Sequence, residues 1–230
     1  MISSACPKKN ICGSCSWSHL PYDVQLKQKL ADVNGSLALK GLAFQCHSII
    51  PAPRTAHYRN RMDFAIDFEG RVGLKEKGKW WRVIDGHACF LAMQSIDELF
   101  KEVRTWVRES ALSCWDRKAH TGLLRYAVIR ASTQGETMVS IITSVPQDEH
   151  EEQQARLALA TLASRSGAST LIWIKNSTIT DVSFGDILEV VSESGFITQD
   201  ISGIQYRISP QAFFQTNPYA APLLLDAVKE

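Results

Sequence analysis

Residues 59–68 read RNRMDFAIDF, and this stretch is the one from which the expected fold follows. Apolar side chains at positions 62, 64, 66 and 68 alternate with charged side chains at 61, 63 and 67. A period of two is typical of a β-strand that packs one face on a core and turns the other toward solvent. Glu69–Gly70 then turns the chain toward Val72 and Leu74, so the pattern predicts an antiparallel hairpin.

Strand and helix patterns alternate along the rest of the chain. Further strands are expected at 80–84, 124–131, 138–143, 171–174, 187–191 and 205–208, and helices at 22–33, 96–107, 151–164 and from Pro218 onward. Asn34–Gly35 is predicted to end the first helix. Hairpins joined by occasional helices predict an α+β fold with a mainly antiparallel sheet and flanking helices.

Composition restricts the class of protein. The 230 residues are 45% hydrophobic, which is enough for one sizeable core or for one domain and the start of another. Lys and Arg total 25 against 24 acidic residues, so contact with nucleic acid would depend on local basic clusters. The sequence has no long apolar segment and no apolar signal region at its start, so we expect a cytoplasmic monomer without a membrane partner.

Three of the six cysteines fall within ten residues, at Cys6, Cys12 and Cys15. Their spacing allows one loop to present three sulfurs to one centre, and Gly13 permits the turn that this requires. Cys89 follows a predicted strand and is the best candidate for a fourth sulfur ligand. The residues alone leave three alternatives open, namely an iron–sulfur cluster, a structural zinc site and cysteines that simply pack.

Two segments combine basic and aromatic side chains. Residues 54–61 cluster arginines around Tyr58, which suits phosphate neutralisation with base stacking, although a solvated strand end is the plain alternative. Residues 122–130 read GLLRYAVIR, where strict alternation would place Arg125 and Arg130 on opposite faces unless a bulge intervenes. The neighbouring pair Trp80–Trp81 is expected in the core and at an interface rather than as a platform on which bases stack.

The clearest change in the sequence pattern, from a predicted strand to a segment bounded by two prolines, comes at residues 208–218, which read ISPQAFFQTNP. The amide of Gln215 can both donate and accept hydrogen bonds, and the rings of Phe213 and Phe214 can stack on planar ligands. Taken alone, the stretch could equally be a proline-initiated turn into an amphipathic helix.

Four segments, in this order, resemble the RNA uridine-5-methyltransferases: 6–20 (CPKKNICGSCSWSHL), 58–66 (YRNRMDFAI), 122–130 and 208–218. Ser14 and Ser18 depart from the usual family pattern without removing a sulfur ligand. The resemblance implies a [4Fe-4S] cluster, S-adenosylmethionine as cofactor and looped or single-stranded RNA as partner. It places the cluster on Cys6, Cys12, Cys15 and Cys89, the cofactor at Gln215, and RNA contacts at Tyr58, Arg59, Asn60, Arg61, Arg125, Arg130, Phe213 and Phe214.

The implied activity is methylation of C5 of a specific uridine, after a cysteine thiolate has added to C6. The short amino terminus, which lacks the small RNA-binding barrel of some members, favours ribosomal over transfer RNA. The implied domains are a cluster loop at 1–20, a central RNA-binding domain at 21–208 and the start of a Rossmann-like methyltransferase domain at 209–230. Neither Cys46 nor Cys114 resembles the family's nucleophile segment, so no catalytic residue is expected here and the chain alone should be inactive. The alternative is a non-catalytic iron–sulfur module that binds RNA.

Overall fold

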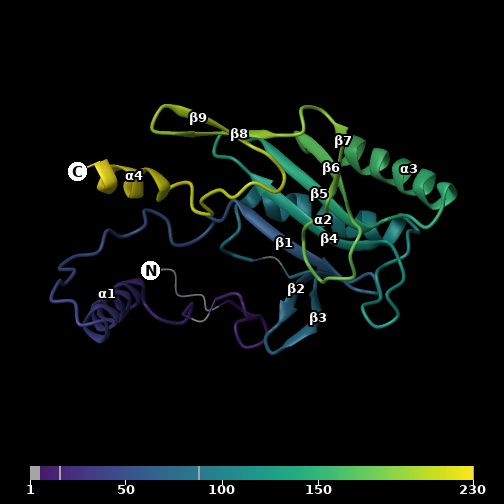
Figure 1. Cartoon of the computed structure of the whole chain (residues 1–230). Coiled ribbons are helices and arrows are strands. Elements are labelled where there is room, and N and C mark those ends of the chain that lie inside the picture. The colour runs from purple at the N-terminus through teal and green to yellow at the C-terminus, as the bar shows by residue number, and fades with distance from the viewer. Residues whose placement is uncertain (1–5, 16, 88, 230) are drawn as a thin grey trace.

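A computed structural model describes residues 6–15, 17–87 and 89–229 (Figure 1). Within these ranges the chain forms four helices and nine strands. The helices are α1 (Tyr22–Leu39), α2 (Gln94–Glu109), α3 (Glu149–Ser166) and α4 (Ala221–Lys229). The strands are β1 (Arg61–Ile66), β2 (Val72–Glu76), β3 (Lys79–Asp85), β4 (Leu124–Ala131), β5 (Thr137–Ser144), β6 (Thr170–Asn176), β7 (Ile187–Ser192), β8 (Ile197–Ile201) and β9 (Ile204–Ile208).

One large sheet organises the molecule. Its strand order is β3-β2-β1-β4-β5-β6-β7, while β8 and β9 form a separate hairpin. Neighbouring strands are antiparallel except β5 and β6, which run parallel and are joined through α3. A parallel pair needs such a crossover because the end of the first strand and the start of the second lie at opposite ends of the two strands. The expected class, with helices flanking a mainly antiparallel sheet, is therefore confirmed.

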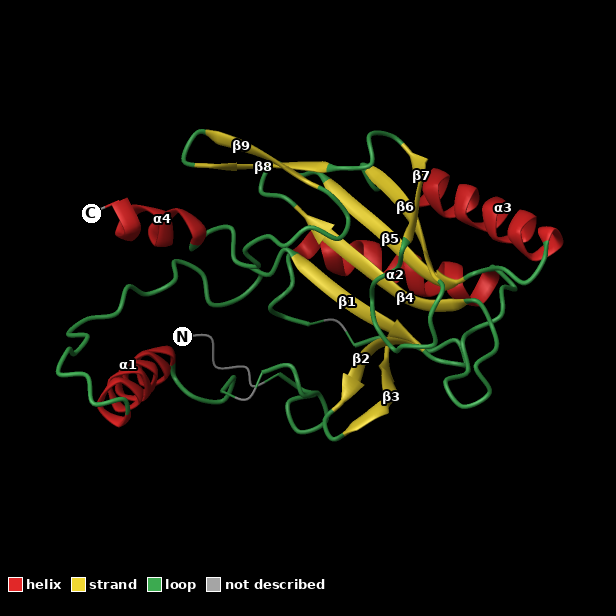
Figure 2. Cartoon of the chain, in the orientation of Figure 1, coloured by secondary structure: helices red, strands yellow, loops and turns green. Residues whose placement is uncertain are grey.

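Both faces of the sheet are covered at its centre. On one face, α2 and α3 lie against the sheet (Figure 2). Phe64, Ile129 and Trp173 belong to a core that also contains buried apolar residues of both helices. On the other face, Val128 and Ile142 pack with residues from the β8–β9 hairpin. Every residue of β4 is consequently buried. The wet face predicted for the strand at 59–68 is found only in part, since Arg61 and Asp63 of β1 are half-buried while Ala65 is buried.

Some element boundaries differ from the prediction. Helix α1 continues through Asn34–Gly35 to Leu39 because an exposed glycine costs a helix only about 1 kcal/mol relative to alanine. The helix ends where Gly41 adopts a positive φ of 71°. Strand β8 was not predicted, and Phe68 lies exposed beyond the end of β1.

The α1 helix has no buried side chain among the described residues. It extends away from the sheet on the same side as α4 (Figure 1). In the part of the chain that the structure describes, no helix has the length and apolar character needed to cross a membrane.

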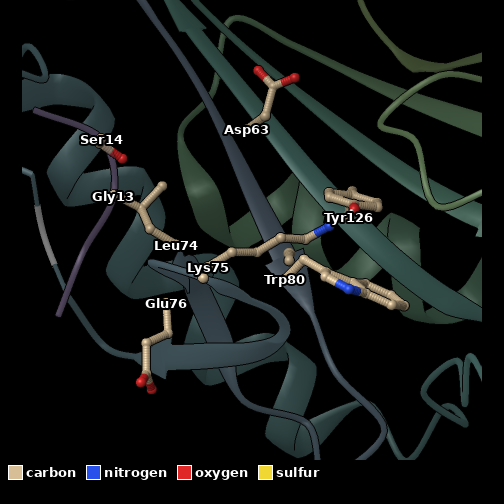
Figure 3. A pocket seen from close by; sticks show the side chains of 10 residues that line it. Gly13, Ser14, Asp63, Leu74, Lys75, Glu76, Trp80 and Tyr126 are labelled. Atoms are coloured by element: carbon tan, nitrogen blue, oxygen red, sulfur yellow. Dashed lines mark hydrogen bonds between the residues drawn. The ribbon is translucent and has the colours of Figure 1, made fainter.

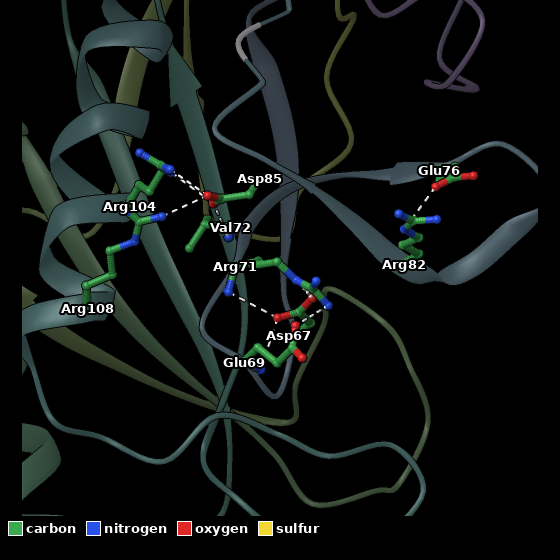
Figure 4. Close-up of polar contacts among 9 residues, drawn as sticks. All are labelled: Asp67, Glu69, Arg71, Val72, Glu76, Arg82, Asp85, Arg104 and Arg108. Carbon is green, nitrogen blue, oxygen red and sulfur yellow. Dashed lines mark hydrogen bonds and ion pairs between the residues drawn. The ribbon is translucent and has the colours of Figure 1, made fainter.

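Asp85 joins the edge of the sheet to α2 (Figure 4). Its Oδ1 atom accepts hydrogen bonds from the Val72 amide at 3.2 Å and from Arg104 Nε at 2.9 Å, and its Oδ2 accepts from Arg108 at 2.7 Å. The hydrogen bond from Arg104 lowers the pKa of Asp85, and burial only partly opposes this. The ionised carboxylate therefore stabilises the folded state.

This arrangement predicts an acid-dependent loss of stability. A carboxyl whose pKa is lowered by folding contributes its stability above its unfolded pKa and loses it as the pH falls through the lowered value. Asp85→Asn should lower the free energy of unfolding by about 1 kcal/mol at pH 7. The difference from the native chain should shrink as the pH falls below about 4.

Urea unfolding at several pH values measures this difference. Asp32→Asn is the control, because the Asp32 carboxylate accepts a hydrogen bond from the uncharged Gln28 amide. A destabilisation by Asp85→Asn that stays constant down to pH 2 would contradict the ion-pair account.

Candidate functional site

The basic patch at 58–61 lies against the loop that carries Cys89. The amide of Arg59 donates to the Leu91 carbonyl at 2.7 Å, and the Met93 amide donates to the Arg59 carbonyl at 3.0 Å. Burial raises the pKa of the half-buried Tyr58, whose surroundings include Cys89 and Cys15. The basic patch at 58–61 and the loop that carries Cys89 are therefore adjacent in space. The separate loop at residues 6–15, with Cys6, Cys12 and Cys15, is called the cysteine loop below.

The arginines of this patch differ in how they are paired. Arg61 holds Asp63 through two hydrogen bonds of 2.8 and 2.9 Å. Burial alone would raise the pKa of Asp63, but the hydrogen bonds from Arg61 and Ser183 outweigh it and the pKa is lowered. Arg59 forms no ion pair with any residue in the described ranges. Arg59 can thus offer its charge to a phosphate, whereas the charge of Arg61 is partly neutralised.

The carboxy-terminal signature is fixed onto the start of β1. The Asn60 side chain donates to the Gln215 carbonyl at 3.0 Å, and the Asn60 amide donates to the Thr216 carbonyl at 3.1 Å. Gln211 and the main chain of Gly185 exchange two further hydrogen bonds of 2.9 and 3.1 Å. Asn60, a predicted RNA contact, is buried and performs this structural task.

The side chains predicted to meet the base and the cofactor have different exposures. Gln215 is exposed, and Phe213 is 85% exposed. Phe214 is half-buried and packs edge-on against Tyr206, with ring centroids 5.9 Å apart. Gln215 and Phe213 are therefore free to contact a ligand, and Phe214 anchors the segment to the β8–β9 hairpin.

Arg125 and Arg130 share one face of the sheet, because β4 contains the bulge that the alternation argument required. The pairing with β5 shifts register between Leu124 and Tyr126. Arg125 donates to the carbonyls of Thr178 and Thr180.

Arg130 donates to the Ala212 carbonyl. Burial lowers its pKa to about 10, so it remains charged at pH 7. Both guanidinium groups are buried and bonded to main-chain carbonyls, so neither Arg125 nor Arg130 is exposed to a ligand such as RNA.

Three of the four cysteines predicted to bind a cluster, Cys12, Cys15 and Cys89, lie near one another. Cys6, Cys12 and Cys89 are buried, and burial raises the pKa of the Cys89 thiol, with Cys15 and Cys12 close enough to add to the effect. The Cys6 sulfur lies 3.8 Å from His87 Nε2. The described residues contain no group of three or more His, Cys, Asp or Glu side chains positioned to hold a metal ion. The thiols are neighbours without ligating geometry.

The remaining two cysteines have other surroundings. Burial, and secondarily Asp67, raises the pKa of Cys114 to about 11. Its thiol is therefore protonated at neutral pH and is a weak nucleophile. The main chain of Cys46 exchanges hydrogen bonds of 2.8 and 2.9 Å with the Asn34 side chain. Both residues are half-buried rather than fully buried.

Sequence reasoning missed a cavity of about 510 Å³ between the cysteine loop and the sheet (Figure 3). Lys75 points across it and donates to Tyr126 Oη and to Asp181 Oδ2, each at 2.7 Å. Trp80 lines the same cavity. Trp80 and Trp81 are 58% and 56% exposed, so the expected core position is wrong, while the expected position at an interface stays a prediction. Their charged neighbours in the run KEKGKWWR were the signal available in the sequence.

Comparison with known proteins relates the whole chain to RNA methyltransferases. A tRNA (uracil(54)-C(5))-methyltransferase of Pyrococcus horikoshii is 33% identical over 230 residues, which are 100% of this chain and 52% of that protein. The corresponding protein of Pyrococcus furiosus is 31% identical over 233 residues, again with 100% of this chain and 52% of the relative covered. The chain therefore spans about half the length of the curated relatives it matches. No family model matches it.

A solved structure is similar as well. The crystal structure of Pyrococcus abyssi tRNA (uracil-54, C5)-methyltransferase in complex with S-adenosyl-L-homocysteine superimposes with a TM-score of 0.75 and 28% identity. The match covers 99% of this chain and 52% of that one. The similarity thus extends to the three-dimensional arrangement of nearly all of the residues.

Proposed function

We propose that this protein takes part in the S-adenosylmethionine-dependent methylation of C5 of a uridine in transfer RNA. The observation that carries the proposal is the 33% identity across the complete chain to a protein named for that reaction. A structural neighbour solved with S-adenosyl-L-homocysteine, the demethylated form of that cofactor, supports the choice of methyl donor. Because these relatives are named for tRNA, we replace the ribosomal RNA expected from the sequence with tRNA.

The role of this chain would be to bind RNA and to present part of the cofactor site. Arg59, which has no ion pair within the described residues, offers its charge beside the half-buried Tyr58. Asn60 donates hydrogen bonds to the main-chain carbonyls of Gln215 and Thr216, and these bonds hold Gln215 next to the basic patch. The side-chain amide of Gln215 can donate and accept hydrogen bonds with the base or the cofactor. The exposed ring of Phe213 can stack on a base that has been turned out of its helix.

We assign no nucleophile among these 230 residues. Uracil C5 becomes reactive only after a thiolate has added to C6, and the raised pKa of Cys114 opposes that role. Cys6, Cys12, Cys15 and Cys89 belong to the proposed cluster, and Cys46 lies in no motif that resembles the nucleophile segment of the family. By itself the chain should therefore bind RNA without methylating it.

We also propose that Cys6, Cys12, Cys15 and Cys89 hold a [4Fe-4S] cluster. Four sulfur ligands are the number that such a cluster requires. The closeness of Cys12 and Cys15 to Cys89 supports the proposal. The loop at residues 6–15 is also joined to the β2–β3 hairpin by a hydrogen bond of 2.8 Å from the Lys77 amide to the Ile11 carbonyl. A bound cluster would add four sulfur bonds to the contacts that Cys12 and Cys15 already make with the core.

A chimera tests the methylation proposal. The 230 residues replace the matching 52% of the Pyrococcus horikoshii protein, and the product is incubated with labelled S-adenosylmethionine and an unmodified tRNA transcript. We expect 5-methyluridine in the tRNA, a loss of at least about tenfold in rate with Gln215→Ala, and none with the 230 residues alone.

Gln205→Ala, an exposed glutamine on β9, is the matched control and should leave the rate unchanged. Methylation of a ribosomal RNA transcript in preference to tRNA, or full activity of Gln215→Ala, would contradict the proposal.

Metal analysis of anaerobically purified protein tests the cluster. We expect about four iron atoms and about four labile sulfides per chain. Cys89→Ser should lose most of both, whereas Cys46→Ser should keep them. Stoichiometric zinc without sulfide would refute the cluster, and full iron content in Cys89→Ser would refute the choice of its fourth ligand.

A further inference from the structure

The β2–β3 hairpin projects beyond the body of the sheet. Strand β1 pairs with β2 only at Val72 and Gly73, and farther along β2 the loop at residues 6–15 meets Glu76 through an isolated bridge from Cys12. The first four residues of β3, which is an edge strand of the sheet, are exposed. This geometry explains why two tryptophans that follow each other in a strand can both face solvent.

The two exposed indoles form a corner. The Trp80 and Trp81 rings lie 5.8 Å apart between centroids and are perpendicular to each other. Two large apolar rings exposed over more than half of their surface cost free energy unless something covers them. Flat faces at right angles suit planar ligands such as nucleobases.

The charge around the corner identifies the ligand class. Residues 75–82 contain four basic side chains, Lys75, Lys77, Lys79 and Arg82, and one acidic side chain, Glu76. Lys79 and Arg82 share Glu76 at 2.7 and 3.3 Å, and Lys75 is paired with Asp181. Lys77 has no ion pair within the described ranges. An aromatic pair surrounded by surplus positive charge matches single-stranded nucleic acid, where bases stack and phosphates need cations.

The cavity beside Trp80 adds a place for the edge of a base. Its volume of about 510 Å³ lies in the range of small-molecule sites, and it is open to solvent next to the indole. Asp63, Lys75 and Tyr126 line it with polar groups that already hydrogen-bond within the protein, so the edge of a base would share or replace those bonds (Figure 3). Gly13 and Ser14 of the cysteine loop form the opposite wall.

We infer that the tip of the β2–β3 hairpin is a second RNA-binding surface, on which Trp80 and Trp81 stack unpaired bases while Lys77 contacts a phosphate. The inference rests on the proposed function in that the RNA is the substrate of the enzyme. It adds a contact surface to that function at a place distinct from the patch at 58–61 and from Gln215. The cavity receives the edge of the base that stacks on Trp80.

Binding of short RNAs tests the surface. A single-stranded oligouridylate and an RNA duplex of equal length are titrated against the 230-residue chain without S-adenosylmethionine. Trp80→Ala combined with Trp81→Ala should weaken binding of the single strand by about tenfold or more, since stacking contributes strongly to affinity for each base. The same residues changed to Phe should retain most of the affinity. Lys77→Ala should reduce the salt slope by about 0.7.

The matched control is Phe68→Ala, which removes an aromatic side chain of similar exposure, 59%, at the β1–β2 turn. It should leave binding unchanged. Circular dichroism and thermal unfolding establish that each variant is folded. If they show that the Ala variants do not fold, quenching of tryptophan fluorescence by the oligouridylate in the native chain decides. An absence of quenching would overturn the inference.

Two results separate this inference from the proposed function. Unchanged single-strand affinity in the Ala variants, or an equal loss for the duplex, would overturn the stacking surface even if the chimera methylates tRNA. A clear loss of affinity for the single strand alone would support the stacking surface even if the chimera does not methylate tRNA. In that case the proposed methylation, and not the surface, is refuted.

Discussion

Two guanidinium groups are buried on the central strand β4, and each must find oxygen acceptors because it keeps its charge at neutral pH. Arg125 obtains them from the carbonyls of Thr178 and Thr180, in the loop between β6 and β7. Arg130 obtains one from Ala212, in the segment that follows β9. The second face of the sheet is therefore covered by chain segments whose position is determined by buried charge.

This constraint positions the candidate site. With residues 209–217 held at Ala212, Asn60 can bond to the carbonyls of Gln215 and Thr216 and bring the exposed Gln215 next to the basic patch. On the other side of the patch, the loop of Cys89 is joined to Arg59 through its main chain. The proposed RNA contacts, the proposed cofactor contact of Gln215 and the loop of Cys89 therefore meet around residues 58–61. The β2–β3 hairpin extends this surface past the loop at residues 6–15.

The sequence predicted most strands and all four helices of the described part, because alternation and helical spacing reflect which side chains are buried. It could not predict the parallel pairing of β5 and β6 or the cover over β4, since these depend on contacts distant along the chain. The common face of Arg125 and Arg130 depended on a bulge, which periodicity cannot locate. The exposure of Trp80 depended on how far β2 and β3 extend past β1, which local sequence also does not determine.

The central claim is that buried charge on β4 holds the 209–217 segment against the sheet. Hydrogen exchange in an Arg130→Met variant, followed peptide by peptide, tests it most directly, with Arg71→Met at the exposed β1–β2 turn as control. We predict faster exchange across 209–217 and at the Asn60 amide, which donates to Thr216, while β5 and β6 stay as protected as in the native chain. Unchanged protection of 209–217 in Arg130→Met would contradict the account.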